Sequence, residues 1–498
     1  MVVVVALLCA GALVPVWYVV QAAFAYGGGE LAALIFRPRA GELLANTVLL
    51  VVLVVPCTVV LGVGGAWLVE RTTLPGARVF VILLAAPLAV PAFVSSYAWG
   101  GSMPFVRGLG GGVFIAVLAY TPFVYLPVLA VLRGLDPAWE ETARSLGHGP
   151  WRAFFRVVLP QLRLAASGGA LVVGLHLLAE FGAFAFIRFE TFTTAIVVAF
   201  QSTFAGPNAA ALGVVLTGLT VVLLALEGAV RGRGRYARVG SGSPRAATRL
   251  PLGRATVPAV AALVVFAVAA VGVPLVMVLR WLLAAGGLDV ATLVSAAVST
   301  AALSTAGAVT AVAVALPIAW LSVRFPTRAS RLLEGTAYLA GSLPAIIVAL
   351  AVVTVSIRLI PVLYQTPVTV IAAYVIVFLP RALVTLRAGI AQVPVGLEEA
   401  AQALGVSPMW ARARVTLPLL LPALGAAGAL VALGAANELT ATLLLAPTGT
   451  RTVATQFWAE ASAVDYPAAA PYALVLVLLS IPAVIIMFAE ATRGRSVR

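Results

Sequence analysis

Charged and metal-binding side chains are scarce in this chain of 498 residues. Aspartate, glutamate, lysine and arginine together make up only 10% of it, and there are two cysteines and two histidines. Neither a disulfide framework nor a zinc centre built from cysteine and histidine clusters is therefore indicated. A GxxxxGK[ST] phosphate-binding loop and a Ser/His/Asp set in a soluble domain are also absent, which argues against ATP hydrolysis or another enzymatic activity in this chain.

Apolar residues take the place of the missing charges. They make up 62% of the sequence, and the mean hydropathy is +1.11. A bilayer core of about 30 Å needs roughly 20 apolar residues per helix. The sequence predicts an all-α polytopic membrane protein with about twelve transmembrane helices, in two tandem six-helix halves. The expected spans are 1–22, 43–70, 79–100, 112–133, 164–187 and 209–230 in the first half, and 256–284, 292–322, 331–356, 365–386, 419–445 and 468–490 in the second.

The positive charge is distributed in a way that does not suggest nucleic acid binding. The net charge is +14, every basic residue is an arginine, and the densest arginine cluster lies between two expected spans. Under the positive-inside rule this cluster, together with its glycines and serines, is a cytoplasmic linker at 231–255. The linker separates two expected transmembrane domains, 1–230 and 256–498. Both termini are then predicted to be cytoplasmic, with the first apolar run taken as a span rather than a signal peptide.

One polar loop occurs twice, at a constant spacing of 258 residues. The copies read EETARSLGHGPWRAFFRVVLP and EEAAQALGVSPMWARARVTLP, and no gap is needed to align them. Weaker echoes surround them, because the Ala-Trp-Leu at 66–68 recurs at 319–321 and the Pro-Ala at 91–92 recurs at 344–345. The chain is therefore a tandem duplication, and both copies of the loop lie on the arginine-rich side.

Each residue type in the loop has a physical reason to be there. Two glutamates suit the start of a short helix, an alanine allows close packing, and a glycine permits a sharp turn. A Leu-Pro pair then suits the first turn of the next span, where the missing N–H costs little. These residues are Glu140, Glu141, Ala143, Gly147, Leu159 and Pro160 in the first copy, and Glu398, Glu399, Ala401, Gly405, Leu417 and Pro418 in the second.

This pattern resembles the EAA loop of binding-protein-dependent ABC permeases, with Thr142 as a mild departure in the first copy. The segments that follow the loops, LAEFGAFAFIRFETFTTAIVVAFQ at 178–201 and NELTATLLLAPTGTRTVATQFW at 437–458, are similar to the fused iron(III) permeases. The resemblance implies the type I ABC importer permease fold. It also implies that each loop forms a coupling helix that docks on an ATPase subunit.

Partners and cargo follow from the same resemblance. It implies a bacterial inner-membrane protein, a dimer of ATPase subunits that binds the ATP and magnesium, and a periplasmic or extracellular substrate-binding protein. No cofactor is expected in this chain. Ferric iron is the expected cargo, whereas thiamine and aminophosphonate permeases are less close alternatives. A secondary transporter driven by an ion gradient is the alternative from another class, since internal repeats are common there too. A membrane-embedded enzyme or assembly factor is a further alternative.

Ionisable residues inside apolar runs are candidates for the substrate pathway. Glu180 and Glu438 stand 258 residues apart, each about twenty residues after its loop proline. At 1.5 Å per residue this is roughly 30 Å along a helix, toward the outer side, with the pair related by the pseudo-two-fold axis of the duplication. His176, one helical turn before Glu180, could contact a metal or be simply hydrogen-bonded. Asn437 could line the path or cap a broken helix. Whether a metal is bound is left open.

Overall fold

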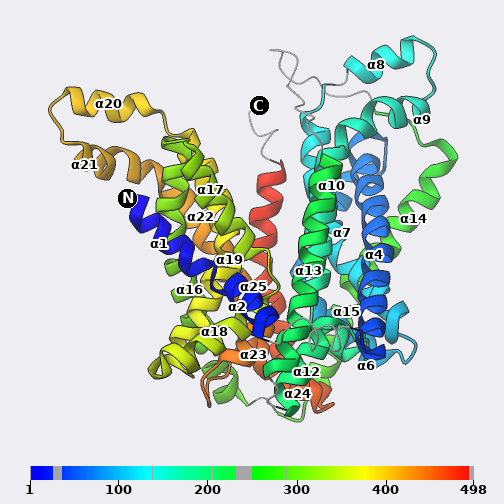
Figure 1. Cartoon of the computed structure of the whole chain (residues 1–498). Helices are drawn as coiled ribbons and strands as arrows, with labels where there is room; N and C mark the ends of the chain where they lie inside the picture. Colours follow the sequence, from blue (N-terminus) through cyan, green and yellow to red (C-terminus); the bar gives the residue numbers. More distant parts are fainter. Residues whose placement is uncertain are drawn as a thin grey trace. The chain divides into compact units, whose positions relative to one another are not determined.

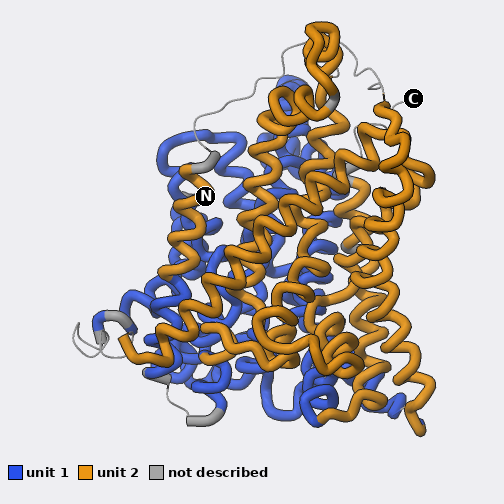
Figure 2. The backbone as a smooth tube through the Cα atoms, turned by 90° about the vertical axis from the view of Figure 1, so that its right-hand side faces the viewer, with its two compact units in different colours: residues 1–35, 196–217, 287–463 blue, residues 36–195, 218–286, 464–498 orange. Residues whose placement is uncertain are grey.

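The computed structural model describes residues 2–25, 36–136, 138–203, 206–231, 249–287 and 289–492. Within these ranges the chain is helical and contains no β-strand, apart from one isolated bridge between Thr72 and Leu250. The helices, labelled in Figure 1, belong to two compact units, which are coloured separately in Figure 2. Unit 1 comprises residues 1–35, 196–217 and 287–463, and unit 2 comprises residues 36–195, 218–286 and 464–498.

The twelve predicted spans all have a counterpart among the described residues. Nine single helices are long and apolar enough to cross a membrane, and three bent helix pairs bring the number to twelve. Most of the predicted linker, from 232 to 248, lies outside the described residues. The end of the linker is described. The Leu250 N–H donates to the Arg71 carbonyl, with nitrogen and oxygen 2.8 Å apart, and the Thr73 N–H donates to the Leu250 carbonyl at 2.9 Å. The chain is therefore a multi-pass membrane protein, and the end of the linker lies at the end of the second span.

Unit 2 is built around three long helices, α4 (Pro38–Arg71), α7 (Gly108–Gly134) and α10 (Leu159–Ala179). A Cβ atom on Gly62 of α4 would lie 2.9 Å from the Cβ of Val124 on α7, so the small residue permits this close packing. The other helices of the unit are α5 (Ala77–Leu83), α6 (Ala92–Ser102), α8 (Ala138–Ser145), α9 (Pro150–Ala153), α11 (Gly182–Phe186), α14 (Thr256–Ala267), α15 (Val273–Ala284) and α25 (Tyr466–Thr492).

Unit 1 repeats this core with α16 (Val290–Arg324), α19 (Pro367–Gln392) and α22 (Leu417–Ala436). It also contains α17 (Arg328–Gly341), α18 (Ala345–Leu359), α20 (Val395–Ala403), α21 (Pro408–Ala411), α23 (Thr440–Leu445) and α24 (Val453–Ser462). The first span, a bent pair of α1 (Val2–Ala12) and α2 (Val14–Ala25), belongs to this unit and packs on α17 and α18. Helices α12 (Phe192–Thr203) and α13 (Gly206–Arg231) are divided between the units. A compact unit thus draws on both sequence halves.

The third span is bent in each half, at the Pro-Ala echo seen in the sequence. Helices α5 and α6 meet at 88°, and α17 and α18 meet at 99°. Pro91 and Pro344 directly precede α6 and α18, with extended backbones at ψ 141° and 140°. Proline lacks an N–H and disfavours the helical conformation in the residue before it, which explains the break in both halves.

Candidate functional site

The first polar loop forms a short helix at one end of unit 2 (Figure 1). Glu140 and Glu141 lie in the first turn of α8, as expected for carboxylates near a helix N-terminus. Glu140 is 5% exposed and forms an ion pair with Arg144 on the next turn of the same helix, whereas Glu141 is exposed. Ala143 is buried beneath the helix, and Gly147 follows it with φ +84°, a conformation that L side chains disfavour.

The second loop has the same backbone at the corresponding end of unit 1 but a different set of contacts. Gly405 has φ +88°, and Glu398 is 8% exposed. The Glu398 carboxylate accepts hydrogen bonds from the hydroxyl of Thr416 at 2.7 Å and from Arg324 at 3.4 Å. Arg324 also donates to the carbonyl of Val393 at 3.1 Å. Helix α20 is therefore held to the ends of α16 and α22, while Glu140 pairs within its own helix.

Both loop prolines lie in the first turn of α10 and α22, but neither span starts there. The apolar helices run from Trp151 to Ala179 and from Pro408 to Ala436, so each begins before the spans predicted from 164 and 419. A π-helical segment, Phe154–Val158 in one loop and Arg412–Thr416 in the other, directly precedes the Leu-Pro pair. The wider turn accommodates a proline that would otherwise clash with a carbonyl of the preceding turn.

A duplicated tryptophan lies under each loop. Trp67, near the end of α4, stacks on Trp151 with ring centroids 5.2 Å apart and contacts Phe154 at 5.5 Å. Its counterpart Trp320, near the end of α16, instead lies beneath the guanidinium groups of Arg324 and Arg412, at 5.4 and 6.0 Å. Aromatic stacking thus supports the first loop and cation–π contacts support the second.

Large apolar side chains point away from both loops. Leu146 is 74% exposed and Leu404 is 85% exposed, in the same position of the repeat. Other exposed apolar residues on the loops are Trp139, Trp151 and Phe155 in the first and Val395, Leu397, Met409 and Trp410 in the second. Both loops therefore expose several large apolar side chains on otherwise polar segments.

The two intramembrane glutamates lie at the opposite ends of α10 and α22 from the loops. The helices end at Ala179 and Ala436, earlier than the predicted 187 and 445, because the chain breaks at these carboxylates and restarts in short helices. Glu180 accepts a hydrogen bond from the Ala183 N–H at 2.9 Å, and Glu438 accepts one from the Ala441 N–H at 3.0 Å. Each duplicated glutamate, directly before the N-cap residue, thus accepts from an N–H in the first turn of the following short helix.

In unit 2 an aromatic group surrounds the first carboxylate. The Tyr120 hydroxyl donates to Glu180 at 2.6 Å, which joins α7 to the end of α10. His176 lies one turn earlier, where its Nδ1 lies 2.8 Å from the carbonyl oxygen of Val172 and its ring packs against Phe123 at a tilt, with ring centroids 4.4 Å apart. Both the histidine ring and the tyrosine hydrogen bond thus connect the end of α10 to α7. No cluster of three or more His, Cys, Asp and Glu side chains able to hold a metal occurs among the described residues.

In unit 1 an arginine lies against the end of α22. Arg381, in the middle of α19, places its guanidinium 4.9 Å from the Phe378 ring centre. Gly434 stands in the repeat where the first half has His176, and a Cβ there would lie 2.5 Å from Arg381. Asn437 is the C-cap of α22 and donates its side-chain amide to the Leu433 carbonyl at 3.0 Å.

Sequence reasoning missed Arg381, although a single arginine inside the predicted span 365–386 was a usable signal. Arg381 lies midway along this apolar helix.

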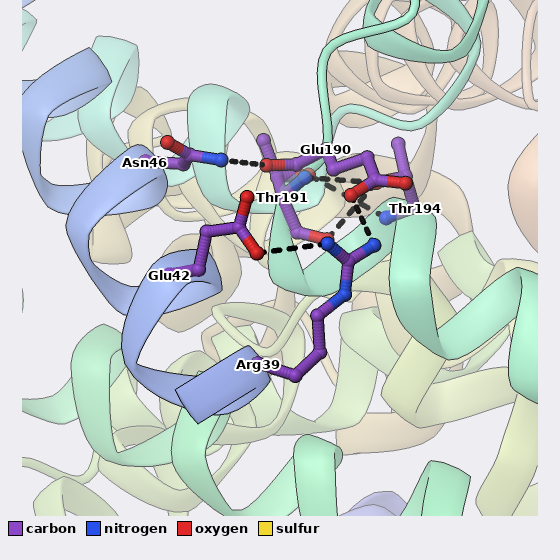
Figure 3. Close-up of polar contacts among 6 residues, drawn as sticks. All are labelled: Arg39, Glu42, Asn46, Glu190, Thr191 and Thr194. Carbon is purple, nitrogen blue, oxygen red and sulfur yellow. Dashed lines mark hydrogen bonds and ion pairs between the residues drawn. The ribbon is translucent and has the colours of Figure 1, made fainter. Parts of the chain in front are cut away.

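A second polar group lies around the start of α4 (Figure 3). Arg39, at the start of α4, forms ion pairs with Glu42 and with Glu190, and the Asn46 side chain donates to the Glu190 carbonyl at 3.0 Å. These side chains are exposed, so each pair contributes less than about 1 kcal/mol. The group fastens the segment before α12 to the start of α4.

Comparison with known proteins gives a family and several relatives. The family described as the inner membrane component of binding-protein-dependent transport systems matches residues 25–235 and 311–492. The Fe(3+)-transport system permease protein FbpB 2 of Haemophilus influenzae is 35% identical over 472 residues, which cover 94% of this chain and 93% of that protein. The sulfate permease CysW of Synechocystis is 30% identical over 156 residues, 28% of this chain and 56% of that protein. The molybdenum permease ModB of Escherichia coli is 30% identical over 139 residues, 24% of this chain and 60% of that protein.

Proposed function

The chain belongs to the inner-membrane components of binding-protein-dependent transport systems, and from this premise we propose that it carries ferric iron across the bacterial inner membrane. It is the permease of an ABC importer, with both transmembrane domains in one chain. The observation that supports the cargo is the similarity, over 94% of the chain, to a relative named as an Fe(3+)-transport permease. Sulfate and molybdenum permeases match much shorter segments, which favours iron over those anions.

The two loops are the proposed docking sites for a dimer of separate ATPase subunits, which bind the ATP and magnesium. Each presents a short helix, a left-handed glycine turn and exposed apolar side chains, among them Leu146 and Leu404. An apolar, protruding helix of this kind fits a groove on a partner and moves as a rigid element with it. The loops and both termini would then face the cytoplasm, and a soluble binding protein would deliver cargo to the other side.

The hydrogen bonds from Thr416 and Arg324 to Glu398 transmit motion from the second loop to the membrane helices. Because α20 is bonded to the ends of both α16 and α22, displacement of the loop pulls on two membrane helices. In the first loop the stack of Trp67 on Trp151 has the same role through packing. ATP binding and hydrolysis in the partner thereby alternate the access of the route through the permease.

Glu180 and Glu438 are the proposed contacts for the passing cargo. Each is partly accessible and lies at a helix break, where irregular backbone at membrane depth is tolerated beside a water-filled route. A carboxylate favours a metal cation there. His176 and Asn437, one turn before and directly beside the carboxylates, line the same helix ends.

Uptake of ferric iron by a bacterial strain that lacks its own ferric importer tests this function. The chain is expressed together with its ATPase and binding protein, and uptake of radioactive ferric iron is measured. We expect uptake that needs all three components and that is lost when the ATPase cannot hydrolyse ATP. Uptake of thiamine or an aminophosphonate in place of iron would replace the cargo, and uptake without any ATPase would favour a secondary transporter.

A further inference from the structure

A tyrosine hydroxyl and a carboxylate lie side by side at the end of α10 in unit 2. The Tyr120 hydroxyl on α7 donates to one oxygen of the Glu180 carboxylate, with the two oxygens 2.6 Å apart. The other carboxylate oxygen accepts from the Ala183 N–H at 2.9 Å, so the carboxylate is oriented from two sides. Adjacent oxygen ligands on a small octahedral cation, bound at about 2.0–2.1 Å, lie about 3 Å apart. The Tyr120 and Glu180 oxygens are therefore spaced as two ligands of one ion.

The imidazole of His176 restricts the tyrosine side chain. Its ring centroid lies 5.6 Å from that of Tyr120 and 4.4 Å from that of Phe123. Its Nδ1 lies 2.8 Å from the carbonyl oxygen of Val172, one turn back on α10, which orients the imidazole. Rings from α7 and α10 thus pack together beside the two oxygens and hold the hydroxyl next to the carboxylate.

The second half does not repeat this pair. At the spacing of 258 residues that relates the loops, Tyr120 corresponds to Phe378, which offers no oxygen to Glu438. A tyrosine does occur one turn earlier on α19, but the hydroxyl oxygen of this Tyr374 lies 2.6 Å from the hydroxyl of Thr442. The pairing of phenol and carboxylate at this position of the repeat therefore belongs to the first half.

We propose that Tyr120 and Glu180 form a transient binding site for the ferric ion, with His176 as the residue that positions the tyrosine. This rests on the proposed function, since it assumes that the cargo is ferric iron. Hard, multiply charged cations prefer oxygen ligands, and tyrosine is an established ligand of protein-bound iron. When the ion binds, the Tyr120 O–H bond breaks, an iron–oxygen bond forms and the proton passes to water. The oxidation state of the iron does not change.

Exposure and ligand number suit passage rather than storage. Glu180 is partly exposed whereas Tyr120 is 6% exposed, so an ion meets the carboxylate before the hydroxyl. A carboxylate inside an apolar segment is costly beside lipid, which favours a hydrated route at its exposed side. Two protein ligands leave the other positions of the ion to water. Passage requires such a site, strong enough to admit the ion and weak enough to release it.

The visible absorption of a ferric phenolate tests the site independently of transport. The permease is purified together with its ATPase and titrated with ferric citrate, while the charge-transfer absorption from phenolate to iron is recorded. The wild type should develop this absorption and Tyr120→Phe should lose it. Glu180→Gln, which keeps an oxygen for the Ala183 N–H, should bind at least about tenfold more weakly, since loss of even an outer-shell partner weakens a metal site by about 10- to 100-fold. The matched control is Tyr125→Phe on the same helix, whose hydroxyl donates to the Val81 carbonyl at 3.1 Å.

Two variants of His176 separate positioning from ligation. His176→Phe keeps an aromatic ring against Tyr120 and should retain both the absorption and nearly the wild-type affinity. His176→Ala removes the ring and should weaken binding while the absorption of the saturated site remains. Loss of binding in both variants alike would overturn the positioning role and make the imidazole a ligand.

Uptake into proteoliposomes connects the site to transport. With equal amounts of assembled complex, Tyr120→Phe should lower maximal ferric uptake by at least about tenfold relative to Tyr125→Phe. Absorption that survives in Tyr120→Phe, or equal losses of uptake in the two phenylalanine variants, would overturn the site while wild-type ferric uptake leaves the proposed function standing. A wild type that does not take up ferric iron would overturn the proposed cargo instead. In that case absorption that depends on Tyr120 would still support the site, and its absence would overturn both.

Discussion

Replacing Gly405 by alanine isolates the geometry of the second loop from its side-chain contacts. Gly405 has φ +88°, and a Cβ at this position meets nothing within 4 Å, so alanine causes backbone strain but no clash. A left-handed conformation costs an L residue roughly 1–2 kcal/mol. If the loop relaxes away from its docking shape to relieve this strain, the docking-competent fraction falls by about 5- to 30-fold. Binding of the ATPase should weaken by the same factor, and uptake at limiting ATPase should fall with it.

Gly396 provides the matched control for this prediction. It lies within α20 in the same loop, and a Cβ there also meets open space. Because alanine is favoured over glycine inside a helix by up to about 1 kcal/mol, Gly396→Ala should dock and transport at least as well as the wild type. Gly405→Asn should be milder than Gly405→Ala, since asparagine tolerates the left-handed region. Docking is measured by titrating the detergent-solubilised permease with ATPase. Equal affinities for Gly405→Ala and Gly396→Ala would refute the role of the turn.

Three further changes give distinct expected results. Glu180→Gln combined with Glu438→Gln should reduce ferric uptake without changing ATPase docking, and normal uptake kinetics would return both carboxylates to a purely structural role. Thr416→Val removes the hydroxyl that donates to the buried Glu398 carboxylate at 2.7 Å, so ATP hydrolysis should continue while uptake per ATP hydrolysed falls. An unchanged ratio of uptake to ATP hydrolysed would show that this hydrogen bond does not couple the loop to the membrane helices. Arg39→Ala removes exposed ion pairs and should change the melting temperature of the purified complex by no more than about 2 °C, and a larger loss would mean that this group carries real stability.

The coarse architecture could be predicted because membrane helices are specified by local composition. Continuous apolar runs have no alternative to helix in a bilayer, so all twelve spans have counterparts among the described residues. The weak Pro-Ala echo at Pro91 and Pro344 also proved to be structural, since the third span bends at both positions. The turns at the loop glycines were predictable because a sharp turn needs φ > 0, which glycine adopts readily.

Features that leave no trace in the hydropathy pattern could not be predicted. The π-helical turns before Pro160 and Pro418 leave no mark in hydropathy, so the fifth span of each half was placed too late in the sequence. Hydropathy also does not show where a helix breaks, so the ends at Ala179 and Ala436 were missed. The packing of the first span against helices of the second half is a long-range contact that no local pattern encodes.

The candidate site was likewise predictable only in part. The duplicated glutamates were visible as isolated charges in apolar runs, but the partners that distinguish them were not. Tyr120 comes from another helix, and Arg381 lies against the end of α22, where a Cβ on Gly434 would come within 2.5 Å of it. Sequence identity between repeats therefore does not imply equal chemistry in the two halves.

We propose that this permease couples transport to an ATPase that docks on its two loops. The most direct test is ferric uptake into proteoliposomes that contain the permease, with ATPase and ATP inside and ferric-loaded binding protein outside. Uptake should stop when the ATPase or ATP is omitted, and it should persist when proton and sodium gradients are collapsed. Uptake that survives without ATPase, or that disappears with the gradients while ATP is present, would contradict it.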